Sequence, residues 1–416
     1  MRSLETLSSG LHPSAGALIA RVRALPAAAE LLRRLGDAPD VHLVGGAVRD
    51  ILMGAEPGDL DLLVEGSAVT IARRLGGELR VHDRFGTATV RVGGFCYDIA
   101  AARREAYARA GALPVLAPAS LEQDLLRRDF SVNAIAIRLS GPRAGELSTA
   151  PRALEDLRAR RLQVLHDRSF SDDPTRLLRL IRYASRLRFE IEPHTLALAR
   201  TAVADRALDT VSALRVGAEL RLLVRELDPV AGLEQMSALG LDAEIHPGFG
   251  LSDPALARRS LGLLPAEGRP DVLVLALCVR AIESAELASL LNRLAFGAVE
   301  RDAIIRVATG AGKLAQSLVG AELPSEIAGA VSGAGAGPEA VAIAGALGPA
   351  QAARDWLTRL AHVRLEISGA DLLAAGIEQG PAVGRALSAA LDAKLDGRAD
   401  GREAELDRAL RAARAS

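Results

Sequence analysis

The sequence predicts an α+β domain with a mixed sheet near the N-terminus, followed by domains that are all helical. Residues 40–140 alternate short apolar runs typical of strands with stretches typical of helices. From about residue 150 onward, Ala, Leu and Arg recur at helical spacing, and alternating runs are almost absent. The chain has 416 residues, of which 49% are apolar, so it is too long for one ordinary core. We therefore expect about two to four domains.

The first domain is expected to follow a helical extension over residues 1–39. Apolar runs between turn residues predict its strands, and amphipathic spacing predicts its helices. The predicted strands are Val41–Val44, Leu60–Val64, Thr87–Val92, Tyr97–Ala100 and Ala134–Leu139, and the predicted helices are Gly46–Met53, Ala68–Leu75 and Leu121–Arg128.

Three helical domains are expected after the first one, over residues 141–215, 216–328 and 329–416. The stretch Gly329–Gly337 (GAVSGAGAG) interrupts the helical pattern. Its glycines predict a loop or a linker between domains.

The composition excludes several kinds of site. Aromatic residues make up 3% of the chain, too few for a surface that stacks one base after another. The net charge is −1, so a nucleic-acid site would have to be a local basic patch. Cys96 and Cys278 form neither a disulfide framework nor a zinc pattern, and we expect both to be small buried residues.

The sequence also predicts a cytoplasmic location with no membrane association. The N-terminus lacks the basic-then-apolar pattern of a signal peptide. The apolar run Val272–Cys278 is far too short to span a bilayer.

The densest signal for chemistry lies in Leu43–Gly66 (LVGGAVRDILMGAEPGDLDLLVEG). A predicted strand leads into Gly45 and Gly46, where a helix begins. Two glycines let a backbone approach a phosphate closely, and the free amides of a helix N-terminus attract anions. Arg49 follows one turn into that helix, where it can bind a triphosphate. A Gly-Gly turn alone is usually only a turn, so this interpretation depends on the residues that follow.

Asp59 and Asp61 follow this turn, and as alternate residues of a strand they point to one face. Carboxylate oxygens suit Mg²⁺, and two such ions can clamp both oxygens of an in-line phosphoryl transfer. A solvated strand edge would explain the pair by itself, but the upstream turn favours a metal site. Asp98, in another predicted strand, is a candidate for a third carboxylate and equally for a strand-end residue.

Together these motifs resemble the signature of the class II tRNA nucleotidyltransferase and bacterial poly(A) polymerase family, within the polymerase-β-like nucleotidyltransferases. The close resemblance covers roughly residues 40–190. It implies a polymerase-β-like head at 40–140, a neck at 141–215, a body at 216–328 and a tail at 329–416. The further matching blocks are Phe85–Thr87 (FGT), Asp98–Tyr107 (DIAAARREAY), Arg127–Ala136 (RRDFSVNAIA), Asp172–Phe189 (DDPTRLLRLIRYASRLRF) and, more loosely, Ser368–Gly384.

The resemblance implies template-independent addition of CMP and AMP, from CTP and ATP, to the 3′ end of tRNA. Mg²⁺ would be the cofactor and tRNA the partner, and no protein partner is implied. Complete CCA addition is the main expectation, and CC-only addition, A-only addition or poly(A) synthesis would also fit the shared motifs. The segment Arg103–Ser120, predicted to be a loop, does not decide among the tRNA activities. The mixed charge of Arg402–Arg414 argues against poly(A) polymerase, since such enzymes often carry a basic C-terminal arm.

Asp172-Asp173-Pro174 predicts a helix start, with an aspartate cap and a proline in the first turn. Asp173 and Arg176 are three residues apart and therefore share a helix face. An aspartate can accept from the exocyclic amine of cytosine or adenine, and an arginine can donate to ring acceptors, so this pair can select C and A over G and U. By resemblance these two residues are the family's selecting pair, and Asp172 stands where glutamate is common.

Other polar residues near this helix are candidates for nucleotide or RNA contacts. Residues 151–190 hold ten arginines and six acidic residues, which suits a strip facing a phosphate backbone. Arg179 and Arg182 continue along the helix as candidate phosphate ligands, although solvated arginines at this spacing are common. By resemblance Arg128 contacts the nucleotide phosphates and Asn133 supports the site, while Asp129 is expected to hold Arg128.

Two rival functions remain from the sequence. His82-Asp83 and His166-Asp167 each spell the HD pair of metal-dependent phosphohydrolases, but such sites need further ligands and the chain has seven scattered histidines. A non-catalytic RNA-binding module with the same fold is the second rival. The intact Gly46, Arg49 and carboxylate pair argue against it.

Overall fold

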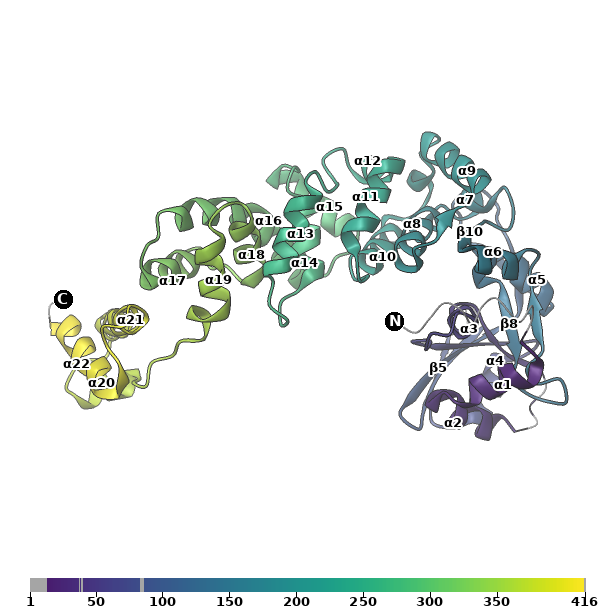
Figure 1. Cartoon of the computed structure of the whole chain (residues 1–416), viewed down its shortest axis with the longest axis horizontal. Coiled ribbons are helices and arrows are strands. Elements are labelled where there is room, and N and C mark those ends of the chain that lie inside the picture. The colour runs from purple at the N-terminus through teal and green to yellow at the C-terminus, as the bar shows by residue number, and fades with distance from the viewer. Residues whose placement is uncertain (1–12, 37, 39, 83–85, 415–416) are drawn as a thin grey trace. The chain divides into compact units, whose positions relative to one another are not determined.

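The computed structural model describes residues 13–36, 38, 40–82 and 86–414, which fall into two compact units, residues 1–212 and 213–416. The first unit contains a mixed sheet with helices, and the second is helical throughout its described residues (Figure 1). The predicted fold class is thus confirmed. The finer boundaries predicted near residues 140, 215 and 328 stay predictions.

A seven-stranded sheet forms the centre of the first unit, in the order β3-β4-β5-β2-β1-β8-β9. Neighbouring strands are antiparallel except β2 and β5, which are parallel. All five predicted strands are present, and β3 and β9 are additional edge strands. The strands are β1 (Val41–Val44), β2 (Leu60–Val64), β3 (Glu78–His82), β4 (Thr87–Val92), β5 (Phe95–Ala101), β8 (Ile135–Arg138) and β9 (Leu147–Thr149).

The helices of the first unit pack on this sheet and continue the chain beyond it. The predicted N-terminal helical extension is present as α1 and α2, while residues 1–12 lie outside the described residues. The three predicted helices are present as α3, α4 and α5, and two of them end one or two residues early. The unit contains α1 (Ala15–Arg23), α2 (Pro26–Leu35), α3 (Gly46–Leu52), α4 (Ala68–Leu75), α5 (Leu121–Leu126), α6 (Ala153–Ala159), α7 (Ser169–Asp172), α8 (Thr175–Leu187), α9 (Pro193–Ala204) and the 3₁₀ turns η3 (Ser131–Asn133) and η4 (Ala207–Thr210).

The segment Arg103–Ser120 is not the loop that the sequence predicted. It contains a two-stranded hairpin of β6 (Arg103–Ala106) and β7 (Val115–Pro118). Arg127 holds β6 in place, because its guanidinium donates to the Arg103 carbonyl at 2.9 Å and to Glu105 at 2.7 Å. The hairpin therefore depends on a long-range partner, which local turn residues do not reveal.

A second departure lies in the chain beyond residue 150, which is not entirely helical. Two short strands, β10 (Arg161–Leu162) and β11 (Glu190–Ile191), pair in parallel on either side of α8 in the chain. Two-residue strands carry no alternating pattern, so sequence periodicity could not find them.

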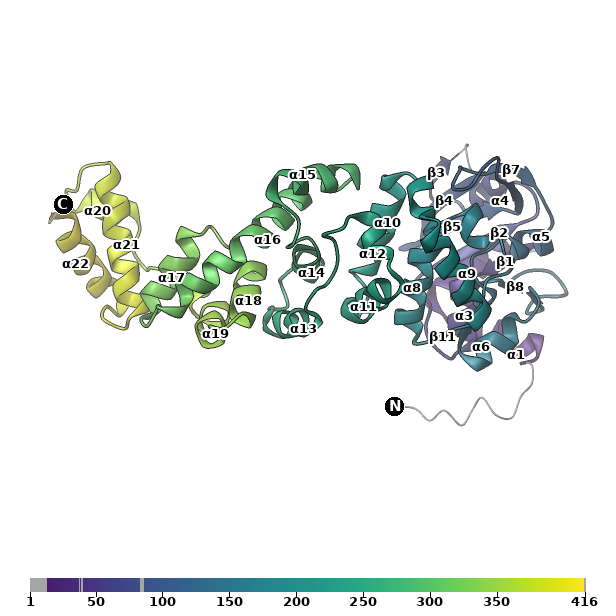
Figure 2. The same cartoon turned by 90° about the horizontal axis from the view of Figure 1, so that it is seen from above.

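The second unit consists of α-helices and one 3₁₀ turn within residues 213–414 (Figure 2). Helix α14 is buried on all sides, and α16 packs against both α14 and α18. The elements are α10 (Ala213–Leu223), α11 (Pro229–Leu239), α12 (Leu241–Ile245), α13 (Pro254–Leu263), α14 (Pro270–Cys278), α15 (Ser284–Arg293), α16 (Ala298–Val319), α17 (Pro324–Gly333), α18 (Pro338–Ala346), α19 (Ala350–Thr358), η5 (Leu360–His362), α20 (Gly369–Ala374), α21 (Pro381–Leu395) and α22 (Gly401–Arg414).

The predicted loop Gly329–Gly337 is wrong over its first half, because α17 continues through Gly333. Pro324 begins this helix, and Glu326 accepts hydrogen bonds from the amides of Glu322 and Leu323 at its N-terminus. Burial of Ile327 and Val331 offsets the low helix propensity of the glycines. Only residues 334–337 form a turn.

No single helix among the described residues is long and apolar enough to cross a membrane. Helices α17 and α18 reach that length and hydropathy only when taken together, and they are bent by 117°.

Gly217 in α10 should be intolerant of a side chain. A Cβ at this position would lie 2.0 Å from the Leu294 carbonyl oxygen, a contact that requires the backbone to shift. We expect Gly217→Ala to lower the free energy of unfolding by about 1–3 kcal/mol, as other overpacked sites do. Gly310→Ala, in the open middle of α16, is the control and should stabilise by up to about 1 kcal/mol. If Gly217→Ala and Gly310→Ala changed the free energy of unfolding equally, in thermal or urea unfolding, the close approach of Gly217 to Leu294 would be contradicted.

Candidate active site

The glycine turn between β1 and α3 has the geometry that the sequence predicted. Gly45 has φ 69°, and its amide donates to the Ile135 carbonyl at 3.0 Å, which ties the turn to β8. A Cβ on Gly45 would lie 2.9 Å from Nη1 of Arg128. Glycine is therefore required at position 45 by the backbone conformation, and a side chain there would also make the Arg128 guanidinium move.

Three aspartates gather beside this turn on one face of the sheet. Asp61 of β2 and Asp98 of β5 are direct register partners in the parallel pair, so their side chains leave the sheet together. Asp59 lies two residues before Asp61, in the loop that leads into β2, and its charge is close enough to raise the pKa of Asp61. The parallel pairing thus brings together carboxylates that the sequence placed only on separate strands.

Burial raises the pKa of Asp61 above its ordinary value, and the negative charges of Asp98 and Asp59 raise it further. Arg128 acts in the opposite direction. Asp61 is partly open to solvent, yet the surrounding protein leaves its charge poorly hydrated. A cation placed between the three carboxylates would relieve this repulsion.

The oxygen donors of these carboxylates suit Mg²⁺, and a magnesium site here stays a prediction. The described residues contain no group of three or more His, Cys, Asp or Glu side chains close enough to hold a metal by themselves. Mg²⁺ does not require one, because it usually takes one or two protein carboxylates and completes its shell with water and substrate phosphates. Asp59 and Asp61 are the residues that would hold it.

A cleft of about 460 Å³ opens over this face. Asp61 and Asp98 line it together with His82, Thr89, Arg127 and Arg128. It therefore presents carboxylates on one side and guanidinium groups on the other, an arrangement suited to a metal-bound phosphate.

The arginines of the cleft are fixed by Asp124 of α5, a fully buried carboxylate. Its Oδ1 accepts from Arg127 at 2.5 Å, and its Oδ2 accepts from Arg128 at 3.2 Å. The expectation that Asp129 holds Arg128 is thus wrong. Asp124 performs that task because it lies one helical turn before Arg128, on the same face of the chain.

Asp129 instead joins the head to α8. Its Oδ2 accepts from Arg179 at 2.6 Å, and its Oδ1 accepts from Asn133 Nδ2 at 3.1 Å. Burial alone would raise the pKa of Asp129, but the Arg179 charge and these hydrogen bonds outweigh it and lower the pKa to about 2.

Arg49 is buried, with 2% of its surface exposed. It donates to Asn133 Oδ1 at 2.6 Å and to Asp50 at 2.9 Å. Asn133 therefore connects Arg49 in α3 to Asp129, and through it to Arg179 in α8. In this structure the Arg49 side chain bonds to Asp50 and Asn133 beside the glycine turn. Its role as a phosphate ligand stays a prediction.

Helix α8 starts close to the predicted place, but the predicted order of an aspartate cap followed by a proline in the first turn is wrong. Asp173 Oδ1 accepts from the amide and hydroxyl of Thr175, at 3.1 and 2.6 Å, from the position before the N-cap. Pro174 is the N-cap residue itself, and Asp172 ends α7.

Arg176 lies one turn beyond Asp173 and is 6% exposed. It donates to Ser169 Oγ at 2.8 Å and to the Arg127 carbonyl at 2.7 Å. These bonds use two of its five N–H donors, and its role in reading a base stays a prediction.

Arg179 and Arg182 surround the ring of Tyr183, with guanidinium carbons 5.5 and 4.8 Å from its centroid. Arg49 approaches the same ring at 5.7 Å. Such cation–π contacts orient guanidinium groups, and Phe130 packs edge-on against Tyr183 at 5.9 Å. The sequence analysis missed Tyr183, although an aromatic residue among helical arginines was a usable signal.

Among the described members of the HD pairs, His82, His166 and Asp167 belong to no group of three or more potential metal ligands. His194 Nε2 lies 2.8 Å from Asp167 Oδ1 on an exposed surface. His82 lies in the carboxylate cleft, while Asp83 and Phe85 lie outside the described residues.

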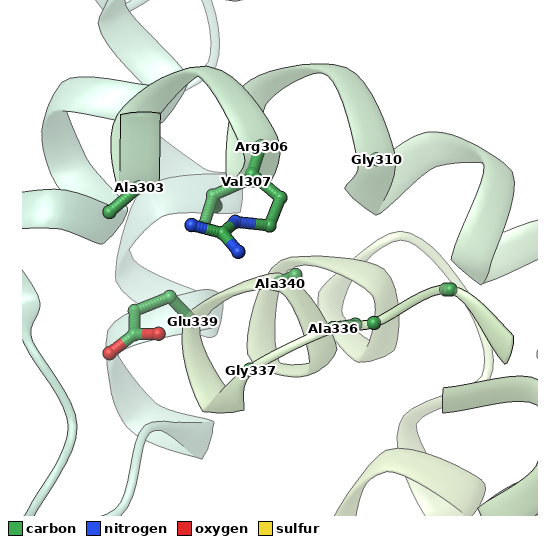
Figure 3. A pocket seen from close by; sticks show the side chains of 10 residues that line it. Ala303, Arg306, Val307, Gly310, Ala336, Gly337, Glu339 and Ala340 are labelled. Carbon is green, nitrogen blue, oxygen red and sulfur yellow. The ribbon is translucent and has the colours of Figure 1, made fainter. Parts of the chain in front are cut away.

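A second hollow, of about 300 Å³, lies in the helical unit beside α16 and the turn that precedes α18. Arg306 points into it, and Glu339 lies on its other side (Figure 3). The Glu339 carboxylate already accepts from the Arg269 amide at 2.8 Å. With glycine, alanine and valine as its other lining residues, this hollow offers no group for phosphoryl transfer.

Known proteins share this arrangement. The family model described as the poly A polymerase head domain matches residues 41–163. The A-adding tRNA nucleotidyltransferase of Geobacter sulfurreducens is 41% identical over 54% of this chain and 27% of its own length. The chain spans 27–52% of the length of the first three curated A-adding relatives that it matches.

Two longer matches cover most of the chain. The CC-adding tRNA nucleotidyltransferase of Deinococcus radiodurans is 33% identical over 86% of this chain and 85% of its own length. The Thermotoga maritima CCA-adding enzyme complexed with tRNA matches with a TM-score of 0.77 and 27% identity, over 96% of this chain and 98% of that one. Together with the carboxylate face and the glycine turn, these matches show that the chain belongs to the class II tRNA nucleotidyltransferase and poly(A) polymerase family.

Proposed function

We propose that this protein adds CMP and AMP from CTP and ATP to the 3′ end of tRNA, with complete CCA addition as its activity. The observation that carries the proposal is the grouping of Asp59, Asp61 and Asp98 beside the Gly45 turn and Arg128, in a chain of this family. The Thermotoga maritima relative in complex with tRNA, and similar structures with CTP and with ATP, support tRNA and both nucleotides as substrates.

In the proposed reaction, the terminal 3′ oxygen of the RNA attacks the α-phosphorus of the nucleotide. A P–O bond forms there, and the bond to the leaving pyrophosphate breaks. In this proposal Asp98 takes the proton of the 3′ hydroxyl, and Arg128 holds the phosphates. Mg²⁺ held by Asp59 and Asp61 would neutralise charge on the attacking and leaving oxygens.

Base selection is assigned to Asp173 and Arg176, with no nucleic-acid template. Asp173 would accept from the exocyclic amine of C or A, and Arg176 would donate to a ring acceptor. The bonds from Arg176 to Ser169 and to the Arg127 carbonyl fix its guanidinium plane. A guanidinium held in one orientation is suited to distinguishing one base from another, which supports the assignment. Arg179 and Arg182 remain candidates for phosphate contacts.

A-only addition is the strongest second candidate, because the A-adding relatives share 39–42% identity with about half of this chain. CC-only addition and poly(A) synthesis are the remaining candidate activities. Incubation of tRNAs that lack three, two or one terminal nucleotides with CTP, ATP or both separates these activities. Completion of all three tRNAs would support CCA addition, and extension only of the tRNA that ends in CC would establish A addition.

Asp59→Ala and Asp61→Ala should each nearly abolish nucleotide addition. The loss of one carboxylate from the metal site should cost at least about 10²- to 10³-fold in kcat. Because the raised pKa of Asp61 means that its charge is unfavourable in the fold, Asp61→Ala should not lower Tm. Glu56→Ala, three residues before Asp59 in an exposed loop, is the control and should retain activity. Near-normal turnover of either aspartate variant at saturating Mg²⁺ would falsify the assignment.

Binding of the tRNA body should depend strongly on salt. We expect the helices after residue 190 to contact mainly phosphates, because the chain has few aromatic residues for stacking. The logarithm of the association constant should fall by about 0.7–0.9 per phosphate neutralised for each decade of salt. A flat titration by filter binding, between low and physiological salt, would argue against phosphate contacts.

Arg176→Ala should damage base selection more than bond formation. It removes donors to the base but leaves the carboxylate face and Arg128 in place. A hydrogen bond to a charged group is worth about 1.5–3 kcal/mol, so discrimination against UTP and GTP should fall by roughly one to two orders of magnitude. Single-turnover addition of each of the four nucleotides measures this.

The competing interpretation is that Asp173 and Arg176 only stabilise the start of α8. It predicts a lower Tm, a slower reaction and an unchanged preference among the four nucleotides. Ser169→Ala removes one of the two bonds that fix Arg176 but keeps the guanidinium, so it should lower discrimination much less than Arg176→Ala does. An Arg176→Ala enzyme that is merely slower would exclude the pair as the base reader.

A further inference from the structure

We infer that Thr89 is a positioning residue for Asp98, and that it fixes which carboxylate oxygen is left to the reaction. The inference rests on the proposed function. Thr89 of β4 lies directly opposite Asp98 of β5 in the antiparallel pair. Its Oγ1 donates to Asp98 Oδ1 at 2.6 Å, the length of a strong bond from a hydroxyl to a charged oxygen.

The strands hold both partners rigidly. Ala88 and Val90, the neighbours of Thr89, are buried at 1% and 0% exposure on the opposite face of the sheet. Tyr97, the residue before Asp98, is also fully buried, and its hydroxyl donates to the Ala27 carbonyl at 2.8 Å. Threonine is β-branched and has a restricted χ1 in a strand, so the position of its Oγ1 is set before any ligand arrives.

The hydrogen bond makes the two oxygens of Asp98 unequal. Within the described ranges, the Asp98 carboxylate accepts a hydrogen bond from Thr89, and that bond goes to Oδ1. Oδ2 is thus left for a metal ion or for the proton of the 3′ hydroxyl. Since Asp61 is the register partner of Asp98 on the other side, the exposed carboxylate of Asp98 is oriented beside Asp61 in the cleft.

His82 also lies near Thr89, but it does not take the place of the hydrogen bond between Thr89 and Asp98. Its Nε2 is 3.5 Å from Thr89 Oγ1, at the limit of a hydrogen bond. The Thr89 hydroxyl has one proton, and the short bond to Asp98 uses it. The orientation of the Asp98 carboxylate therefore depends on Thr89 more than on His82.

The test compares Thr89→Val, which removes the hydroxyl but keeps the shape, with Thr89→Ser, which keeps the hydroxyl. We expect Thr89→Val to lower kcat by roughly 10- to 100-fold, with KM for CTP, ATP and tRNA changed by less than about threefold. Thr89→Ser should restore kcat to within about threefold of the wild-type value. Thr149→Val, in the edge strand β9 away from the cleft, controls for the substitution type.

Two further measurements separate positioning from a general structural effect. If Thr89 acts through Asp98, Thr89→Val should cause no additional loss in an Asp98→Asn background. Mn²⁺ binding, followed by electron paramagnetic resonance without RNA or nucleotide, should weaken by about tenfold in Thr89→Val and recover in Thr89→Ser.

Equal losses from Thr89→Val in the wild-type and Asp98→Asn backgrounds would overturn the inference, as would wild-type kcat and Mn²⁺ affinity in Thr89→Val. The inference would also be overturned if kcat fell in proportion to Tm in Thr89→Val and if Thr89→Ser did not restore it. If the wild-type protein adds no nucleotide to tRNA, the proposed function fails, while the Mn²⁺ titration still tests the role of Thr89.

Discussion

The parallel pairing of β2 with β5 is the constraint on which the candidate site depends. Every other neighbouring pair in the sheet is antiparallel, and this one alone sets Asp61 beside Asp98 on the same face. A shift of one residue in this register would turn the Asp98 side chain to the opposite face of the sheet. The buried neighbours of Asp98, Tyr97 and Ile99, prevent such a shift because they would then face water. The hydrophobic core therefore determines where the charges of the site lie.

A second set of contacts connects the glycine turn to α8. Asn133 joins Arg49 of α3 to Asp129, and Asp129 holds Arg179 of α8. Each member is buried or half-buried, and a missing partner would leave a charge or an amide without compensation. The turn and α8 are thus parts of one polar cluster, and a displacement of either would disturb the other.

Local patterns predicted most of the fold and the residues that gather at the candidate site. The strands that carry Asp61 and Asp98, the position of Asp59 just before one of them, and the approximate start of α8 were recoverable from alternation and helix-start signals. The partners of the arginines were missed for two different reasons. Asp124 supports Arg128 at a spacing of four residues, a helical pattern that the sequence contains and the prediction passed over in favour of Asp129. The β6–β7 hairpin depends on the bond from Arg127 to Glu105, two residues far apart in the chain that no local pattern connects. Thr89 carried no signal, since only strand pairing places it against Asp98.

The order of the strands also has a consequence for synthesis of the protein. Strand β1 lies between β2 and β8, and the Gly45 amide needs the Ile135 carbonyl. Until residues 135–138 have left the ribosome, the nascent chain leaves one edge of β1 unpaired and cannot close its glycine turn. Strand pairing over such a separation forms later than local helices do, so the head is exposed to aggregation until β8 has joined the sheet. Chaperone dependence during translation should therefore be concentrated in the head and not in the helices that follow it.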